Sequence, residues 1–195
     1  LPEQEFPNLN MIATTITARD LPRWAAHPRV RAITLDRPVN AAWNVRPGLP
    51  ESFLQRVTGV AATTLSGSGI GIAVIDSGIA QHSDIWVKQR VDFTGARVKY
   101  DDYGHGTHVA GIIGGNGSAS SGTYKGVAPA ANLINLKTSD AFGMTYESDV
   151  VAAMQWVYNN KATYNIRVVN LSMNSTVAQS YHTSPLDAAV EVLWF

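Results

Sequence analysis

Two short motifs in this chain carry residue types that could do chemistry. Asp76 ends an apolar run and is followed by Ser77 and Gly78. His105 stands in the sequence G-H-G-T-H-V-A-G, where its small neighbours would let another chain approach the imidazole closely. A histidine side chain can take up and release protons near neutral pH. The two motifs therefore make Asp76 and His105 candidates for a functional site.

Other interpretations of the same residues stay open at the level of single motifs. His105 and His108 are three residues apart and could bind a metal ion from one face of a helix. Against this, no glutamate general base and no third ligand at a recognised spacing stand nearby. Asp76, taken alone, could also be a structural residue that caps the turn after it.

The elements that must position these residues follow a strand–helix alternation. Apolar runs at residues 69–76, 132–136 and 167–172 predict strands buried on both faces. Residues 147–160 have apolar side chains at helical spacing and acidic ones in the first turn, which predicts a helix. A further buried helix is expected after the histidine motif. Together they predict an α/β fold with a parallel sheet and Asp76 at the carboxyl end of one strand.

The segment before residue 53 has a different pattern. Residues 10–18 and 30–35 predict strands, and residues 19–27 predict a short helix with Asp20 as its N-cap and Pro22 in its first turn. Residues 36–52 are rich in proline and glycine and predict a linker.

The end of the chain predicts one more helix, with Ser184 as its N-cap and residues 188–195 as its body. It stops on Leu-Trp-Phe without a cap, and large apolar side chains left in water cost about 1.5–3 kcal/mol each. We therefore interpret this end as a cut through a longer polypeptide.

Bulk composition sets outer limits on function. The chain has 195 residues, 45% of them hydrophobic, with 15 basic and 15 acidic residues, so no net charge favours nucleic acid or an anionic membrane. It has no cysteine and therefore neither a disulfide framework nor a thiolate metal site. No run reaches the roughly 18–20 apolar residues of a membrane span. The first residues are not a signal peptide, and an upstream segment could have carried one.

The motifs resemble those of a known family. V-I-D-S-G-I at residues 74–79 followed by G-H-G-T-H-V-A-G at 104–111 is similar to the Asp and His motifs of the subtilisin-like serine peptidases, or subtilases. The sequences G-V-A-P at 126–129 and V-V-N-L-S at 168–172 support the resemblance, which extends over residues 65–195. It implies a three-layer α/β parallel-sheet fold of the subtilisin type, incomplete here and preceded by a small α+β propeptide-like unit.

The resemblance also implies a division of the chain. Residues 1–40 would be a propeptide-like remnant, residues 41–64 a linker with the start of the catalytic domain, and residues 65–195 the N-terminal part of that domain. In the family the propeptide assists folding and inhibits by laying its end in the substrate cleft. The maturation cleavage is accordingly expected within residues 36–52.

The implied activity is that of a secreted or extracellular serine endopeptidase that hydrolyses peptide bonds in polypeptide substrates. Asp76 and His105 are the expected catalytic residues of an Asp-His-Ser triad. The chain contains no Gly-Thr-Ser nucleophile motif, so the C-terminal remainder of the same protein would supply the serine, and this chain alone should be inactive. The alternatives are a catalytically inactive interaction protein with the same fold, and a metal-dependent hydrolase that uses His105 and His108.

Substrate contacts are expected on two edge strands that capture an extended peptide between them. Met173 and Asn174 stand where the family usually has leucine and glycine, so Asn174 adds a side chain beside the substrate. The residues that match these strands are Gly143, Met144, Thr145, Ser172, Met173 and Asn174.

No cofactor and no catalytic metal are expected. Asp84 matches a family position that can bind structural calcium, but the loop at 116–124 lacks the usual calcium-loop sequence, so no calcium site is assigned. The expected partners are a polypeptide substrate and the C-terminal remainder, and neither nucleic acid nor a membrane.

Overall fold

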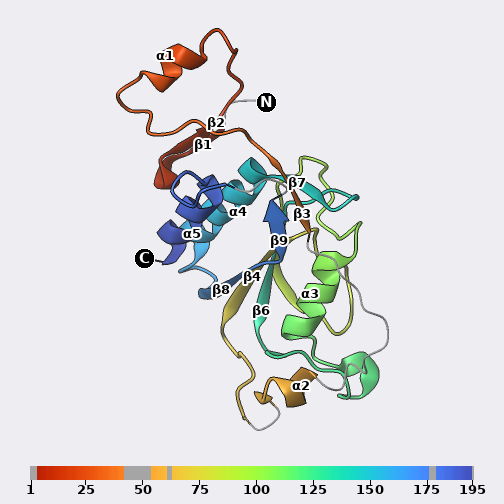
Figure 1. The fold of residues 1–195 in the computed structure, drawn as a ribbon. Coiled ribbons are helices and arrows are strands. Elements are labelled where there is room, and N and C mark those ends of the chain that lie inside the picture. The colour runs from red at the N-terminus through yellow and green to blue at the C-terminus, as the bar shows by residue number, and fades with distance from the viewer. Residues whose placement is uncertain (1–3, 42–53, 61–62, 176–178, 195) are drawn as a thin grey trace.

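A four-stranded parallel sheet forms the centre of the molecule (Figure 1). The computed structural model describes residues 4–41, 54–60, 63–175 and 179–194. Across the sheet the strands follow the order β5 (Val87–Asp92), β6 (Asn132–Lys137), β4 (Gly71–Asp76) and β8 (Ile166–Leu171), and each neighbouring pair is parallel.

Helices cover both faces of this sheet. Ala73 and Ile75 of β4 share a buried cluster with residues of α4, whereas Ile72 and Val74 pack in a second cluster with Ala110 of α3. Successive side chains of a strand point to opposite faces, so β4 contributes to two separate cores. The result is a three-layer α/β arrangement built from α3 (His105–Gly114) on one face and from α4 (Glu147–Asn160) and α5 (Pro185–Trp194) on the other.

A second sheet lies beside the first and contains a strand from the N-terminal segment. Its order is β7 (Met144–Tyr146), β3 (Pro38–Ala41) and β9 (Met173–Ser175), with β3 in the middle and antiparallel to both neighbours. A strand from the N-terminal segment therefore pairs with two strands from the second half of the chain.

An N-terminal hairpin packs on the helical layer of α4 and α5. Strands β1 (Gln4–Phe6) and β2 (Met11–Ala13) pair antiparallel around the 3-10 helix η1 (Pro7–Leu9). Phe6 and Leu9 are buried in the same core cluster as α4. The remaining elements are α1 (Leu21–Ala25), α2 (Leu54–Val57) and the 3-10 helix η4 (Ser118–Ser120).

Several sequence predictions agree with these elements. The predicted helix at 147–160 is α4, the three predicted strands are β4, β6 and β8, and the helix after the histidine motif is α3. The predicted burial on both faces is wrong for β8, because this strand lies at the edge of the sheet and its Val168 is 49% exposed. Ser184 begins α5 as expected, because its Oγ accepts a hydrogen bond from the Asp187 amide at 3.2 Å. The predicted α/β class with a parallel sheet and three layers is confirmed, whereas no observation bears on the predicted domain boundaries.

The predictions for the N-terminal segment are partly wrong. Residues 30–35 form no strand: Leu35 is 74% exposed, and no strand among the described residues pairs with this segment to complete its backbone hydrogen bonds. Only Met11–Ala13 of the predicted strand at 10–18 is a strand. Asp20 precedes α1, but its side chain does not cap the helix and instead accepts a hydrogen bond from Thr17 Oγ1.

The predicted linker at 36–52 is also wrong at its start, because residues 38–41 form β3; residues 42–52 lie outside the described residues.

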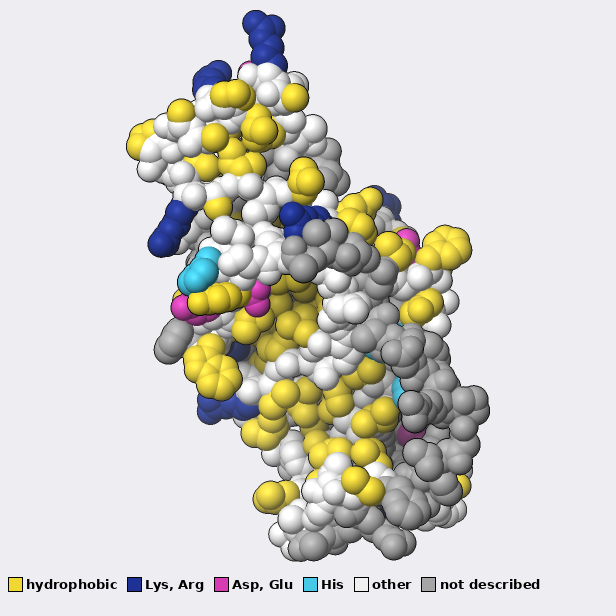
Figure 2. Space-filling model, viewed as in Figure 1, with side chains coloured by type: hydrophobic (Ala, Val, Ile, Leu, Met, Phe, Trp, Pro, Cys, Tyr) yellow, Lys and Arg dark blue, Asp and Glu magenta, His cyan; other side chains and the backbone are white. Residues whose placement is uncertain are grey.

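The surface in Figure 2 shows where side chains of each kind gather. Hydrophobic side chains occupy much of the face between the N-terminal hairpin and the lower part of the molecule, while charged ones lie singly around them. Within the part of the chain that the structure describes, no helix is long and apolar enough to cross a membrane.

Candidate active site

The two predicted catalytic residues meet at one end of the central sheet. Asp76 is the last residue of β4 and is fully buried, and His105 is the first residue of α3 and is 4% exposed. His105 Nδ1 lies 2.7 Å from Asp76 Oδ1. A strand end and a helix start, 29 residues apart in sequence, thus place a carboxylate against one ring nitrogen of an imidazole.

The surroundings of Asp76 oppose its ionisation on balance. Burial raises the pKa of Asp76 above its ordinary value, and the hydrogen bonds from His105 and from the Ser77 amide lower it only in part. The Ser77 amide donates to the same Oδ1 at 2.7 Å. A carboxylate held in this way stabilises positive charge on His105, because little water competes for it.

Glycines around His105 make this close approach sterically allowed. A Cβ at Gly106 would overlap with the Gly78 carbonyl oxygen and would lie 3.1 Å from Asp76 Oδ1. Gly104 precedes the helix with a φ of 101°, a conformation that residues with a side chain rarely adopt. The small residues flanking His105 therefore allow the start of α3 to pack against β4. The sequence had predicted a different role for them, which was to let a substrate chain approach the imidazole.

A polar network that the sequence did not predict connects the two segments. Asp101 accepts hydrogen bonds from Ser77 Oγ at 2.8 Å and from the amides of Gly104 and Thr107 at 2.7 Å and 2.9 Å. Ser77 Oγ accepts one in turn from the Gly106 amide at 2.9 Å. Asp101, a few residues ahead of the helix, could have been predicted from the sequence to accept hydrogen bonds from amides at the helix start, but its bond to Ser77 could not.

A buried lysine lies beneath the same turn. Lys137, at the end of β6 and 1% exposed, donates from Nζ to the Ser77 carbonyl oxygen at 2.7 Å. Its Nζ is also 3.6 Å from Asp102 Oδ2. Since Asp76 and Lys137 are register partners in the sheet, Lys137 holds the turn that directly follows Asp76.

The predicted substrate-binding residues lie on the strands that flank β3. Met144 and Thr145 belong to β7, and Met173 and Asn174 belong to β9. Gly143 precedes β7 with a φ of 76°, and Ser172 lies between β8 and β9. The space between the two strands is occupied by the protein's own β3, in antiparallel register with both.

The middle of β3 is firmly held. Val39 is fully buried and lies opposite Thr145 on β7 and Ser175 on β9. The two residues before β3 contact the start of α4: Asp36 Oδ1 accepts a hydrogen bond from the Ser148 amide at 2.9 Å, and the Arg37 carbonyl oxygen accepts one from the Glu147 amide at 2.9 Å. The N-terminal segment therefore satisfies two of the amides that a helix start leaves without partners.

The geometry gives little support to metal binding by His105 and His108. His108 is exposed on α3, and within the described residues no three His, Asp or Glu side chains lie close enough together to hold a metal ion. Asp84, the residue matched to a family calcium position, accepts hydrogen bonds at its Oδ1 from Ser118 Oγ at 2.8 Å and the Ala119 amide at 2.6 Å. These bonds lower the pKa of Asp84 and fasten the loop after α3.

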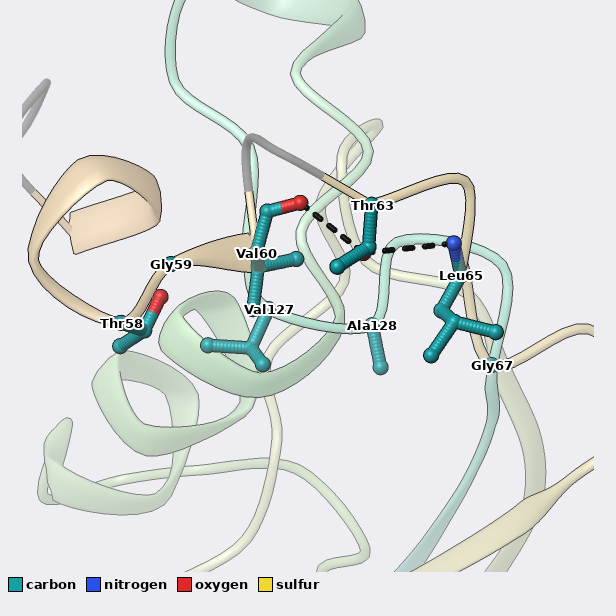
Figure 3. A pocket seen from close by; sticks show the side chains of 8 residues that line it. All are labelled: Thr58, Gly59, Val60, Thr63, Leu65, Gly67, Val127 and Ala128. Carbon is teal, nitrogen blue, oxygen red and sulfur yellow. Dashed lines mark hydrogen bonds between the residues drawn. The ribbon is translucent and has the colours of Figure 1, made fainter.

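A shallow pocket lies near the far end of α3 from His105 (Figure 3). Two of its lining residues, Val127 and Ala128, donate backbone hydrogen bonds to the carbonyl groups of Ile112 and Ile113. The lining contains no ionisable side chain, so it offers no acid or base: it consists of Thr58, Gly59, Val60, Thr63, Leu65, Gly67, Val127 and Ala128.

Comparison with known proteins gives a consistent result. The family model described as "Subtilase family" matches residues 67–193. Serine protease AprX of Bacillus subtilis is 36% identical over 141 residues, which are 67% of this chain and 31% of that protein. The thermostable alkaline protease of Halalkalibacterium halodurans is 32% identical over 177 residues, which are 90% of this chain and 46% of that protein.

A solved structure with a similar fold is that of Sphericase. It superposes with a TM-score of 0.60 at 30% sequence identity, over 72% of this chain and 48% of the Sphericase chain. The chain thus spans about a third to a half of the length of the proteins it matches.

Proposed function

Because this chain belongs to the subtilase family, we propose that it is part of a serine endopeptidase that hydrolyses polypeptides through Asp76, His105 and a serine outside these 195 residues. Its fold is the three-layer α/β fold of the subtilisin type. The observation that carries the proposal is the 2.7 Å contact between His105 Nδ1 and Asp76 Oδ1 at the carboxyl end of the sheet.

In the proposed reaction His105 moves two protons. As the serine oxygen attacks the peptide carbonyl carbon, Nε2 of His105 takes the hydroxyl proton and then gives it to the leaving amine. This leaves an acyl-serine ester. A water molecule attacks the ester as it gives a proton to the same nitrogen, which passes that proton to the serine oxygen as the acid product leaves. Throughout, Nδ1–H of His105 donates to Asp76, which fixes the tautomer and stabilises the imidazolium.

The proposed substrate site is the space between β7 and β9. An extended peptide there would become the middle strand of a three-stranded antiparallel sheet and bind largely through its backbone. Met144 and Thr145 on one side, and Met173 and Asn174 on the other, would contact it. Support comes from β3, which already takes this position as an extended segment.

We further propose that the N-terminal segment is an inhibitory propeptide, because β3 excludes a substrate strand from its place between β7 and β9. The hairpin of β1 and β2 adds affinity by burying Phe6 and Leu9 against the helical layer. An extracellular location is part of the proposal and rests on the family resemblance alone.

The test is peptide hydrolysis by the full-length gene product and by variants at the two residues. We expect Asp76→Asn and His105→Ala each to lower kcat by about 10⁴-fold or more, because either change removes the oriented base. His108→Ala is the matched control, since His108 is exposed on the same helix, and it should keep kcat within about threefold of the parent.

Two outcomes would contradict the proposal. If Asp76→Asn or His105→Ala keeps activity within tenfold of the parent, these residues do not have the roles assigned to them. If the full-length product binds peptides but hydrolyses none, the inactive interaction protein is the better description of this fold.

A further inference from the structure

The relative position of Asp76 and His105 depends on how two chain segments are joined. One segment is the turn after β4, and the other is the loop and first turn of α3. Apart from the Asp76–His105 pair itself, Ser77 Oγ links them directly, since it accepts from the Gly106 amide at 2.9 Å and donates to Asp101 at 2.8 Å.

Asp101 is the centre of this junction. Its Oδ1 accepts hydrogen bonds from Ser77 Oγ and from the amides of Tyr103 and Gly104, at 2.8, 3.1 and 2.7 Å. Its Oδ2 accepts two from Thr107, one from the amide at 2.9 Å and one from Oγ1. Five donors thus converge on one carboxylate.

These donors surround His105 in sequence. Gly104 and Thr107 bind Asp101 directly, and Gly106 is held through Ser77. Thr107 Oγ1 also accepts a hydrogen bond from the Ala80 amide at 2.9 Å, which gives a second link back to the segment after β4. The backbone on both sides of the imidazole is therefore fixed relative to β4.

The surroundings of Asp101 favour its ionised form. Burial alone would raise its pKa, but the hydrogen bonds from Thr107, Gly104 and Ser77 outweigh burial and hold the pKa of Asp101 below its ordinary value. Asparagine could not replace it, because an amide NH2 would face some of the five donors while only one oxygen remained to accept.

We propose that Asp101 is a positioning residue for catalysis: it fastens the start of α3 to the turn after β4 and so sets the contact between His105 and Asp76. This inference rests on the proposed function and assigns a role to a residue outside the triad. Asp101 need not touch substrate, because it acts through the backbone that carries His105.

The first test is the kinetics of Asp101→Asn in the full-length gene product. We expect kcat to fall by about 10- to 100-fold, the range that a misplacement on the order of 1 Å produces. KM should change less than threefold, because none of the five donors belongs to β7 or β9. Glu191→Gln is the control: it makes the same change from carboxylate to amide at an exposed residue of α5, on the opposite face of the sheet from α3, and should keep kcat within threefold of the parent.

The deciding measurement combines Asp101→Asn with Asp76→Asn. If Asp101 acts by aligning His105 with Asp76, its loss should cost less than threefold once Asp76 is already changed. A loss in the double variant as large as that of Asp101→Asn in the parent would overturn the proposal. The proposed function would still stand on Asp76→Asn and His105→Ala alone.

A measurement that does not depend on turnover distinguishes the positioning role of Asp101 from the proposed peptidase function. The NMR resonance of the His105 Nδ1 proton, which reports the hydrogen bond to Asp76, should move upfield in Asp101→Asn because that bond becomes longer and weaker. An unchanged resonance overturns the positioning role, whether or not the protein hydrolyses peptides. Should Asp101→Asn not fold, Ser77→Ala, which removes the bridge between Asp101 and Gly106, is measured by the same criteria.

Discussion

At Gly106 the active site has no room for a side chain, since a Cβ would overlap with the Gly78 carbonyl oxygen. We expect Gly106→Ala in the full-length gene product to lower kcat by at least about 100-fold, because the start of α3 must move away from Asp76 to relieve the overlap. Steady-state kinetics on a peptide substrate measure this change.

Gly111 provides the matched control on the same helix. A Cβ there meets nothing within 4 Å, so Gly111→Ala should leave kcat unchanged and stabilise α3 by about 0.5–1 kcal/mol. If the two alanine variants have equal activity, the close approach at Gly106 has no catalytic importance.

At the scale of residues, the sequence predicted a part of the site and missed the rest. Asp76 and His105 could be identified because each stands in a contiguous motif, and the structure brings their side chains into contact. Asp101 could not be assigned its partners, since Ser77 precedes it by 24 residues and only the folded chain brings the two together. Local sequence shows residue types, whereas a hydrogen-bond network depends on tertiary geometry.

At the scale of elements, β3 is the strand on which the proposed inhibition depends. We expect Val39→Asp to weaken its hold between β7 and β9, because a buried carboxylate without a partner costs several kcal/mol. In a His105→Ala precursor, which cannot process itself, a labelled tetrapeptide should then bind at least tenfold more tightly. Fluorescence anisotropy measures this affinity.

The control for Val39→Asp is Leu35→Asp in the same precursor. It makes a comparable change from apolar to charged at a side chain that is 74% exposed, so tetrapeptide affinity should match the parent. Equal affinities in the Val39→Asp precursor and the parent would show that β3 does not block the peptide site.

The sequence predicted helices and strands correctly where a local residue pattern determines them. It failed where pairing with a strand distant in sequence determines them. Helix α4 and the strands β4, β6 and β8 each carry an apolar pattern of their own, and the sequence located them well. Residues 30–35 have a better strand pattern than residues 38–41, yet only the latter lie between two available strand edges. Strand formation depends on a partner, and the partners of β3 are more than a hundred residues away in sequence.

At the scale of the whole molecule, the N-terminal segment and α4 meet in a cluster of carboxylates. Burial raises the pKa of Asp149 to about 6, and the charges of Asp36 and Asp92 add to the rise. Burial likewise raises the pKa of Glu147, which also faces Asp36 and Asp187, with Arg37 opposing. The segment thus brings one negative charge close to several others.

This cluster predicts a pH dependence of stability. The folded pKa of Asp149 is above its ordinary value of 3.8, so its contribution is fully present below about pH 4 and is lost as the pH rises through about 6. Asp149→Asn should therefore raise the Tm of the His105→Ala precursor at pH 7 and leave it unchanged at pH 4. Because Asp149 is partly exposed, we expect a gain of only about 1 kcal/mol, or a few degrees.

The pH series itself provides the internal control for this prediction. Thermal unfolding is followed at pH 4, 5, 6 and 7, and the difference between variant and parent should grow steadily across the series. A constant difference at all four values would mean that the ionisation of Asp149 does not limit stability.

The position of β3 also determines how a free peptide would compete with it. A strand attached to the enzyme it blocks is present at an effective concentration in the millimolar range, whatever the dilution of the protein. Free peptides at micromolar concentration cannot displace such a tethered strand, even when they bind the edges of β7 and β9 equally well. If β3 inhibits as proposed, a cut in the chain after β3 would remove this local advantage, and dilution of the released segment would then be enough to free the peptide site.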